Sequence, residues 1–180
     1  MPHAPIETER LLIRRFDLDD AVFILELLNE PGWLRFIGDK GIRTLEGARQ
    51  YIERGPMASY EAHGFGLSMV ALKESGLAAG MAGLIRREGL EDVDVGFAFL
   101  ERHMGRGYAR EAAEAVVAQG WDSFGLPRIV AITTPDNLRS IQLLEAIGFR
   151  FERQFQMPDD DEDLNLYAKE RPAPTAASSA

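Results

Sequence analysis

The sequence contains no cysteine among its 180 residues. Disulfide bonds, a cysteine nucleophile and a cysteine-ligated metal are therefore excluded. A chain without disulfides is typical of a reducing compartment, and we expect a cytoplasmic location. The first residues, Met1 to Pro5, have no apolar core of a secretory signal. No apolar run approaches the roughly 20 residues that a membrane-spanning helix needs, so we expect no membrane partner.

Basic side chains are also scarce. The chain has 20 Lys and Arg against 29 Asp and Glu, which gives a net charge of −9. Proteins that bind nucleic acid non-specifically rely on neutralising phosphates, so this balance argues against a nucleic-acid partner. It still permits a cationic substrate, or an anionic cosubstrate held by a local cluster of arginines.

Metal binding has little support in the sequence. The three histidines, His3, His63 and His103, lack the spacing of metal ligands, and we expect no metal. The acidic run Asp159–Asp163 lacks the spaced ligands and central glycine of a calcium loop. We interpret it as a solvated loop between two strands, where it could border the acceptor site and attract a cationic substrate.

Apolar patterning predicts one α/β domain with a mixed sheet. Turn residues and apolar periodicity predict four helices, over about 17–30, 44–64, 108–124 and 136–147, with Pro31 ending the first of them. They predict strands over 9–16, 65–72, 77–87, 92–100, 128–134, 149–155 and 164–168. The folded domain is expected over 7–170, and the Pro/Ala/Ser-rich residues 171–180 as a disordered tail.

The segment from Arg102 to Ala109, Arg-His-Met-Gly-Arg-Gly-Tyr-Ala, lies between a predicted strand and a predicted helix. Free N–H groups and the positive end of a helix dipole meet at such a junction and form a phosphate site. Gly105 and Gly107 allow an anion to approach the main chain closely. An ordinary strand-to-helix turn is the alternative. A P-loop is excluded because no Gly-Lys-Ser/Thr follows, and a dinucleotide fingerprint is excluded because Arg110 occupies its third glycine position.

This segment resembles the acyl-CoA pyrophosphate loop of the GNAT N-acetyltransferase superfamily. Asp136–Phe149 is similar to the next motif of that superfamily, in which an Asn opens a helix that ends in Gly-Phe. Glu9–Arg14 and Asp94–Phe97 resemble strands of the branch that contains ribosomal-protein N-terminal acetyltransferases. The resemblance extends over about residues 7–169.

The resemblance implies a single-domain GNAT fold, with a mixed, mostly antiparallel sheet whose fourth and fifth strands splay apart and are flanked by helices. It implies acetyl-CoA as cosubstrate, with the pantetheine arm between the splayed strands. The arm would pair with the backbone of Phe99 and Leu100 and form a hydrogen bond with Asn137. The pyrophosphate would lie against the loop residues Arg102, Gly105, Arg106, Gly107, Tyr108 and Ala109.

The catalytic residues are less clear from the resemblance. Many family members have a tyrosine as general acid seven residues after the motif asparagine, and this chain has Leu144 there. Ser140 falls where some members of the branch have a serine proposed for that role; the alternative is a helix serine bonded to nearby backbone. Asp94 is the candidate general base, with an exposed strand carboxylate as the alternative, and Asp92 is the second choice.

We therefore expect an N-acetyltransferase that passes an acetyl group to a primary amine by direct attack in a ternary complex, since no cysteine is present to form an acyl-enzyme. The branch suggests a protein N-terminus as acceptor. A small amine is an alternative acceptor. A non-catalytic acyl-CoA-binding regulatory module is an alternative function, because Leu144 replaces the usual general acid. Trp33 and Phe36 lie where relatives line the acceptor pocket, although a core role is equally compatible. The oligomeric state is open between monomer and homodimer.

Overall fold

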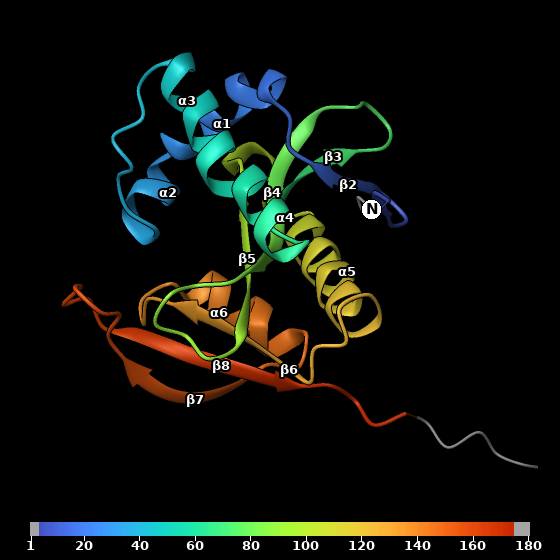
Figure 1. Cartoon of the computed structure of the whole chain (residues 1–180), viewed down its shortest axis with the longest axis vertical. Coiled ribbons are helices and arrows are strands. Elements are labelled where there is room, and N and C mark those ends of the chain that lie inside the picture. The colour runs from blue at the N-terminus through green and yellow to red at the C-terminus, as the bar shows by residue number, and fades with distance from the viewer. Residues whose placement is uncertain (1–3, 175–180) are drawn as a thin grey trace, which may run out of the picture.

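The computed structural model describes residues 4–174, which form an eight-stranded sheet flanked by helices (Figure 1). The strands are β1 (Ile6–Glu7), β2 (Leu11–Arg15), β3 (Leu67–Leu72), β4 (Ala78–Ile85), β5 (Val93–Phe99), β6 (Arg128–Thr133), β7 (Arg150–Phe155) and β8 (Leu164–Glu170). The α-helices are α1 (Ala21–Leu28), α2 (Pro31–Phe36), α3 (Leu45–Ile52), α4 (Ala58–His63), α5 (Tyr108–Asp122) and α6 (Leu138–Ala146).

The strand order is β1-β2-β3-β4-β5-β6-β8-β7. Every neighbouring pair is antiparallel except β5 and β6, which are parallel. The parallel pairing covers only Val93 with Ile129 and Asp94 with Val130, and the two strands diverge beyond it. In Figure 1, β6, β8 and β7 accordingly lie across the lower part of the molecule, turned away from β2–β5. The expected mixed, mostly antiparallel sheet with a splayed pair is confirmed.

Alternation along β5 separates two apolar cores, one on each face of the sheet. Val93, Val95 and Phe99 join the core beneath α5, and Phe97 packs against it. Ala98 packs on the opposite face, in the core formed with α1 and α3. The face that carries Asp94 and Ala98 is therefore the face covered by the N-terminal helices.

Two helical predictions need correction. Pro31 does not end the first helix: α1 stops at Leu28, and Pro31 begins α2, since proline has no N–H to lose in the first turn of a helix. The helix predicted over 44–64 starts and stops as expected, with the Thr44 side chain accepting from the Gly47 N–H and Gly64 in the left-handed conformation at its end. Its middle is a π-helical segment, Glu53–Met57, because Pro56 cannot complete a regular turn.

The remaining strand and helix predictions agree with the structure to within a few residues, apart from the short strand β1, which the sequence analysis did not include. Of the predicted tail, residues 175–180 lie outside the described part of the chain, as does His3. Among residues 4–174, no helix is long and apolar enough to cross a membrane.

Candidate active site

The predicted phosphate loop connects the end of β5 to the start of α5 through a 3-10 turn, Glu101–His103. Gly105 and Gly107 have φ angles of 75° and 80°, in the left-handed region that favours glycine. The backbone N–H groups of Gly105, Arg106 and Gly107 lie in the loop and donate no hydrogen bond to any residue among 4–174. The first N–H groups of α5 also have no helical carbonyl before them to accept their hydrogen bonds. The loop therefore presents a run of free donors at a positive helix end, which suits a phosphate.

Arg10, from the turn before β2, holds this loop from the other end of the chain. Its Nη1 donates to the Arg106 carbonyl at 2.7 Å, its Nε donates to Glu111 at 2.7 Å, and its guanidinium lies 4.6 Å from the centre of the Tyr108 ring. A Cβ placed on Gly107 would lie 3.2 Å from Arg10 Nη2. The sequence analysis did not identify Arg10 as a site residue, because its proximity to the loop arises only in the folded chain.

Glu111 fixes the position of Arg10. One carboxylate oxygen accepts from the Thr8 hydroxyl at 2.6 Å and from the Arg10 N–H at 2.9 Å, while the other accepts from Arg10 Nε. Burial would raise the pKa of Glu111, but these hydrogen bonds outweigh it and lower that pKa. Glu111 therefore stays ionised and ties the N-terminal strands to the first turn of α5.

Arg102, predicted to bind the cosubstrate, forms an ion pair with Glu26 of α1. The second guanidinium nitrogen lies 3.2 Å from the same carboxylate. His103 beside it is buried, and neither ring nitrogen has a hydrogen-bond partner among residues 4–174. Burial lowers the pKa of His103, and the charge of Arg102 lowers it further, so the imidazole is neutral at physiological pH.

The facing edges of β5 and β6 supply the second part of the site. The Leu100 N–H donates to the Ala79 carbonyl at 2.9 Å, so it is committed to β4. Because backbone groups alternate between the two edges of an antiparallel strand, Phe97 and Phe99 present theirs toward β6. There they meet no β6 partner, because the pairing stops at Asp94. The open edge thus includes the predicted Phe99, whereas the Leu100 N–H is already used.

Asn137 and Ser140 begin α6 beside the divergent end of β6. The Asn137 side chain accepts from the Ser140 N–H at 3.3 Å, which makes Asn137 the N-cap of α6 and leaves its amide NH₂ without a partner among residues 4–174. The Ser140 hydroxyl makes no hydrogen bond to any described residue. Leu144 is 1% exposed and belongs to the core beneath α5, to which α6 also contributes. A side chain at position 144 therefore packs in the interior and does not line the site.

Asp94 is 1% exposed, so the alternative of an exposed strand carboxylate is wrong. Its Oδ2 accepts from Arg87 Nε at 2.5 Å, while its Oδ1 has no partner among residues 4–174. Burial raises the pKa of Asp94 more than the charge of Arg87 lowers it. A carboxylate with one free oxygen and a raised pKa can take up a proton. Arg87 was not singled out from the sequence.

Tyr51 of α3 lies close enough to Arg87 for the two to interact electrostatically. Burial raises the pKa of Tyr51 to about 12, although Arg87 opposes the shift. Asp92, the second choice for the base, accepts from Arg128 Nε at 3.0 Å. Arg128 also pairs with Glu152 and Glu170. The position of Asp92 is that of a structural ion-pair residue, and the structure favours Asp94.

The two aromatic residues of the α1–α3 region have different environments. Trp33 is buried in the core with α1, and its indole N–H donates to the Gly38 carbonyl at 3.0 Å. Phe36 is half-buried, with the Arg35 guanidinium 4.7 Å from its ring centre. Arg35 also lies 3.5 Å from Asp136, next to Asn137. Helix α2 therefore approaches the start of α6 through Arg35, whereas Trp33 is a core residue.

The acidic run Asp159–Asp163 forms the exposed loop between β7 and β8. The loop closes on itself, with Gln156 donating to the Asp163 carboxylate at 3.0 Å. No group of three or more potential metal ligands occurs in the described part of the chain. A Cβ on Gly89, in the β4–β5 connection, would lie 2.8 Å from Pro158. The acidic loop therefore packs against the connection that carries Arg87.

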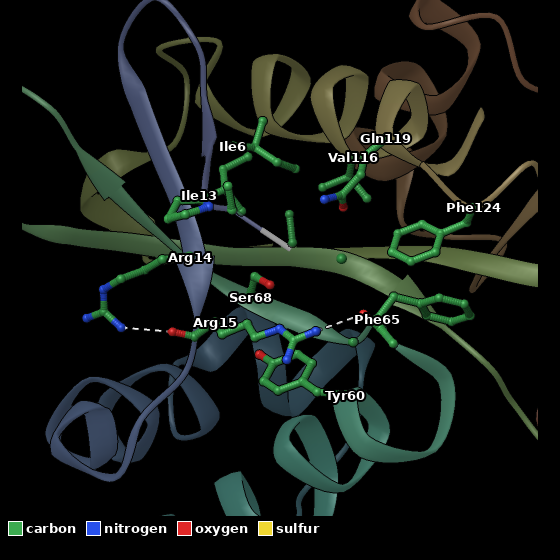
Figure 2. A pocket seen from close by; sticks show the side chains of 16 residues that line it. Ile6, Ile13, Arg14, Arg15, Tyr60, Phe65, Ser68, Val116, Gln119 and Phe124 are labelled. Atoms are coloured by element: carbon green, nitrogen blue, oxygen red, sulfur yellow. Dashed lines mark hydrogen bonds between the residues drawn. The ribbon is translucent and has the colours of Figure 1, made fainter. Parts of the chain in front are cut away.

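A separate cavity of about 430 Å³ lies between the N-terminal strands and α5. Figure 2 shows Ile13, Val116 and Phe124 around it, with Arg15 stacked on Tyr60 at one side. None of the predicted site residues lines this cavity, so it is distinct from the site between β5 and β6.

Comparison with known proteins agrees with this geometry. A family model described as the acetyltransferase (GNAT) domain matches residues 10–150. The N-acetyltransferase YnaD of Bacillus subtilis is 28% identical over 151 residues, which cover 84% of this chain and 85% of YnaD. The crystal structure of an acetyltransferase from Agrobacterium tumefaciens has a TM-score of 0.80 at 26% identity, covering 95% of this chain and 96% of that one.

Ribosomal-protein acetyltransferases share the fold at lower identity. RimL, the ribosomal L7/L12 α-N-protein acetyltransferase whose structure was solved with coenzyme A, has a TM-score of 0.77 at 18% identity, covering 93% of this chain and 98% of RimL. The splayed strands and the glycine loop are thus found in a chain that matches the family model over most of its length. This protein belongs to the GNAT acetyltransferase family and is an acyltransferase enzyme.

Proposed function

We propose that this enzyme transfers the acetyl group of acetyl-CoA to the α-amine of a peptide N-terminus, by direct attack within a ternary complex. The observation that carries the proposal is the two-residue pairing of β5 and β6, which opens onto the free N–H groups of the glycine loop. An extended diamide such as pantetheine can satisfy unpaired strand edges, and the loop donors can hold its diphosphate.

On the cosubstrate side, the N–H groups from Gly105 to Ala109 would hold the pyrophosphate, with Arg106 and Arg102 adding positive charge. Arg102 would do so as part of its pair with Glu26. The backbone of Phe99 would face the pantetheine arm, and the free amide NH₂ of Asn137 would donate to it. The Leu100 carbonyl is not available for this role, because it accepts from the His103 N–H at 2.9 Å. Left-handed Gly107, with Arg10 behind it, keeps the main chain open at the diphosphate.

The reaction needs a neutral amine to attack the thioester carbonyl. Asp94 Oδ1, which has no partner among residues 4–174, would accept the ammonium proton through a water molecule, while Arg87 holds Oδ2. Even with its pKa raised by burial, a carboxylate is a weaker base than an amine. Asp94 therefore suits an acceptor whose own pKa is low.

That reasoning favours an α-amine. A peptide α-amine with a pKa near 8 is roughly one-tenth neutral at pH 7, whereas a lysine side chain near 10.4 is neutral at about one part in a few thousand. The lysine would need a stronger base than the Asp94–Arg87 pair offers.

Breakdown of the tetrahedral intermediate expels the CoA thiolate. The Ser140 hydroxyl, which has no partner among residues 4–174, is available to donate a proton to the sulfur. Since an ordinary thiol has a pKa of about 8.5, a weak acid is sufficient for this step. Ser140→Ala should therefore lower kcat by about 100-fold or less and leave the Kd of CoA unchanged.

The decisive experiment measures thiol release from acetyl-CoA at pH 7 with three acceptor sets: peptides with a free N-terminus, Nα-blocked lysine peptides, and small amines. We expect kcat/KM to be at least about 10-fold higher for the free N-termini than for blocked lysine. Faster turnover of a small amine than of every peptide would overturn the proposed acceptor. Tight CoA binding without thiol release in any set would overturn the proposed transfer reaction.

A further inference from the structure

A pocket outside the groups used so far lies next to α3. It has a volume of about 570 Å³ and is formed between residues 40–44 and one face of the helix. Helix α3 presents Gln50 and Tyr51 to the pocket, the π-helical segment after it presents Arg54, and the connecting segment adds Lys40 and Arg43. We call Lys40, Arg43 and Arg54, together with Tyr51, the basic pocket.

The basic pocket is positively charged although the protein carries a net charge of −9. Arg43 is paired with Asp39 at 2.6 Å. Lys40 and Arg54 make no ion pair with any residue in 4–174, and both are exposed. The nearby carboxylate of Glu46 accepts from Gln50 at 3.2 Å. Two cations are thus left without a counter-charge in a concave surface.

Tyr51 links the basic pocket to the sheet face that carries Asp94, because it lines the pocket and also packs against the core on that face, as Ala98 of β5 does. On the same face, Arg87 holds Asp94 at the last paired position of β5 and β6. Helix α3 packs on the sheet face that carries Asp94. An acceptor whose amine reaches Asp94 from this face therefore has the basic pocket beside it.

The β4–β5 connection, which carries Arg87, approaches the β7–β8 loop, since a Cβ on Gly89 would lie 2.8 Å from Pro158. The acidic run Asp159–Asp163 follows Pro158 directly in that loop. The acidic run attracts an ammonium and the basic pocket attracts an anion, so together they can orient a substrate that carries both groups.

We propose that the acceptor peptide carries an anionic side chain, a carboxylate or a phosphate, within its first few residues, and that Lys40 and Arg54 bind it in the basic pocket. The inference rests on the proposed function, because it takes the peptide α-amine as the reacting group. Lysine and arginine recognise either anion through charge-assisted hydrogen bonds.

The test uses hexapeptide amides of one neutral sequence in which a single Asp is moved from position 2 to position 5, each matched by Asn at the same position. A third set carries phosphoserine and separates the two anion sources. We expect kcat/KM for at least one Asp or phosphoserine peptide to exceed that of its neutral match by about 10-fold at low salt, and the ratio to fall as salt is added.

The double variant Lys40→Gln/Arg54→Gln should reduce that ratio to about 1 and leave the Kd of CoA unchanged. Arg49→Gln is the matched control, because Arg49 is an exposed cation of the same helix that does not line the pocket. If Arg49→Gln lowers the ratio as much as the double variant does, the preference comes from the overall electrostatic field of the protein, and the basic pocket is overturned as a site.

Failure of the inference can be distinguished from failure of the proposed function. If peptides are acetylated but anionic and neutral peptides react equally, the proposed function stands and the inference is overturned. If no peptide is acetylated, the proposed function falls, and calorimetry of the same peptide pairs on CoA-saturated protein still tests the pocket. Equal affinities there overturn it, and tighter binding of the anionic peptides supports it.

Discussion

The proposed cosubstrate half and the proposed acceptor half of this site are built from different parts of the chain. The cosubstrate half consists mainly of backbone groups within one continuous stretch, from Phe99 to Ala109. The acceptor half consists of side chains from separate elements: Tyr51 on α3, Arg87 after β4 and Asp94 on β5. Backbone donors depend on local conformation, whereas converging side chains depend on the whole fold. The two halves should therefore respond differently to mutation.

The largest expected effect follows from removing the backbone freedom of the loop. Gly107→Ala places a Cβ 3.2 Å from Arg10 Nη2 and imposes a left-handed alanine. We expect the Kd of CoA to rise by about 100-fold or more, because several phosphate donors would shift together. Titration calorimetry measures the change.

The matched control for that variant is Gly76→Ala. Gly76 lies in the β3–β4 turn with a similar φ of 72° and open space around its Cβ position. It should show the same backbone strain, of about 1–2 kcal/mol, with no loss of CoA affinity. If Gly107→Ala binds CoA as the control does, the loop is not the phosphate site.

A side-chain change in the acceptor half should leave CoA binding intact and lower turnover. Asp94→Asn should reduce kcat/KM by up to about 100-fold, with the largest loss at low pH, and the loss should shrink as pH approaches the pKa of the amine. Asp92→Asn, two residues away and paired with Arg128, should be nearly silent in the pH–rate profile. Equal profiles for the two variants would remove Asp94 from the reaction.

The variant Asp94→Asn also tests the free-energy cost of burying the ionised Asp94 carboxylate. Because burial raises the folded-state pKa of Asp94 above its unfolded value, ionising the group destabilises the fold. The stability that protonated Asp94 contributes is fully present below the unfolded pKa and is lost as pH rises through the folded pKa. The Tm of Asp94→Asn relative to wild type should therefore increase from about pH 3 toward neutrality, as read by calorimetric melts. A difference that is constant with pH would contradict the raised pKa.

Arg10 is an exception in the cosubstrate half, because it contributes a side chain from the N-terminal part of the chain to a region built mainly of backbone groups. Arg10→Gln should raise the Kd of CoA by about 10-fold, because the Arg106 carbonyl and the Tyr108 ring lose their anchor. Binding of pantetheine, which lacks the diphosphate, should not change. Arg110→Gln removes an equal charge from a residue whose one ion pair among residues 4–174 is with Glu114, and it should have a smaller effect. Equal losses for CoA and pantetheine would indicate a general folding defect.

Asn137 gives the smallest expected effect and separates two roles of one side chain. Asn137→Ala should lower stability by about 0.5–2 kcal/mol through loss of the α6 cap. It should also raise the KM for acetyl-CoA by about 5-fold, equivalent to about 1 kcal/mol for one lost hydrogen bond to the pantetheine arm. Asn137→Asp keeps the capping oxygen and lacks the amide donor. A raised KM with a wild-type Tm in Asn137→Asp would assign the donor to the cosubstrate, and a normal KM would leave only the cap.

Much of the cosubstrate half could be predicted from the sequence because its determinants are local. Glycines at 105 and 107, the strand before them and the helix after them define the loop without reference to the rest of the fold. The structure also confirms the cap at Asn137 for the same reason. Local conformation depends on neighbouring residues, which the sequence displays directly.

Other features were decided only by tertiary packing. Proline position alone did not distinguish the end of α1 from the start of α2, and alternation along β5 did not show that the face of Asp94 is covered by helices. Arg10 reaches the loop, and Arg87 reaches Asp94, across the assembled sheet. Burial and pairing of a side chain depend on what packs over it, and for Asp94 that packing converts an ordinary strand carboxylate into a buried group with a raised pKa.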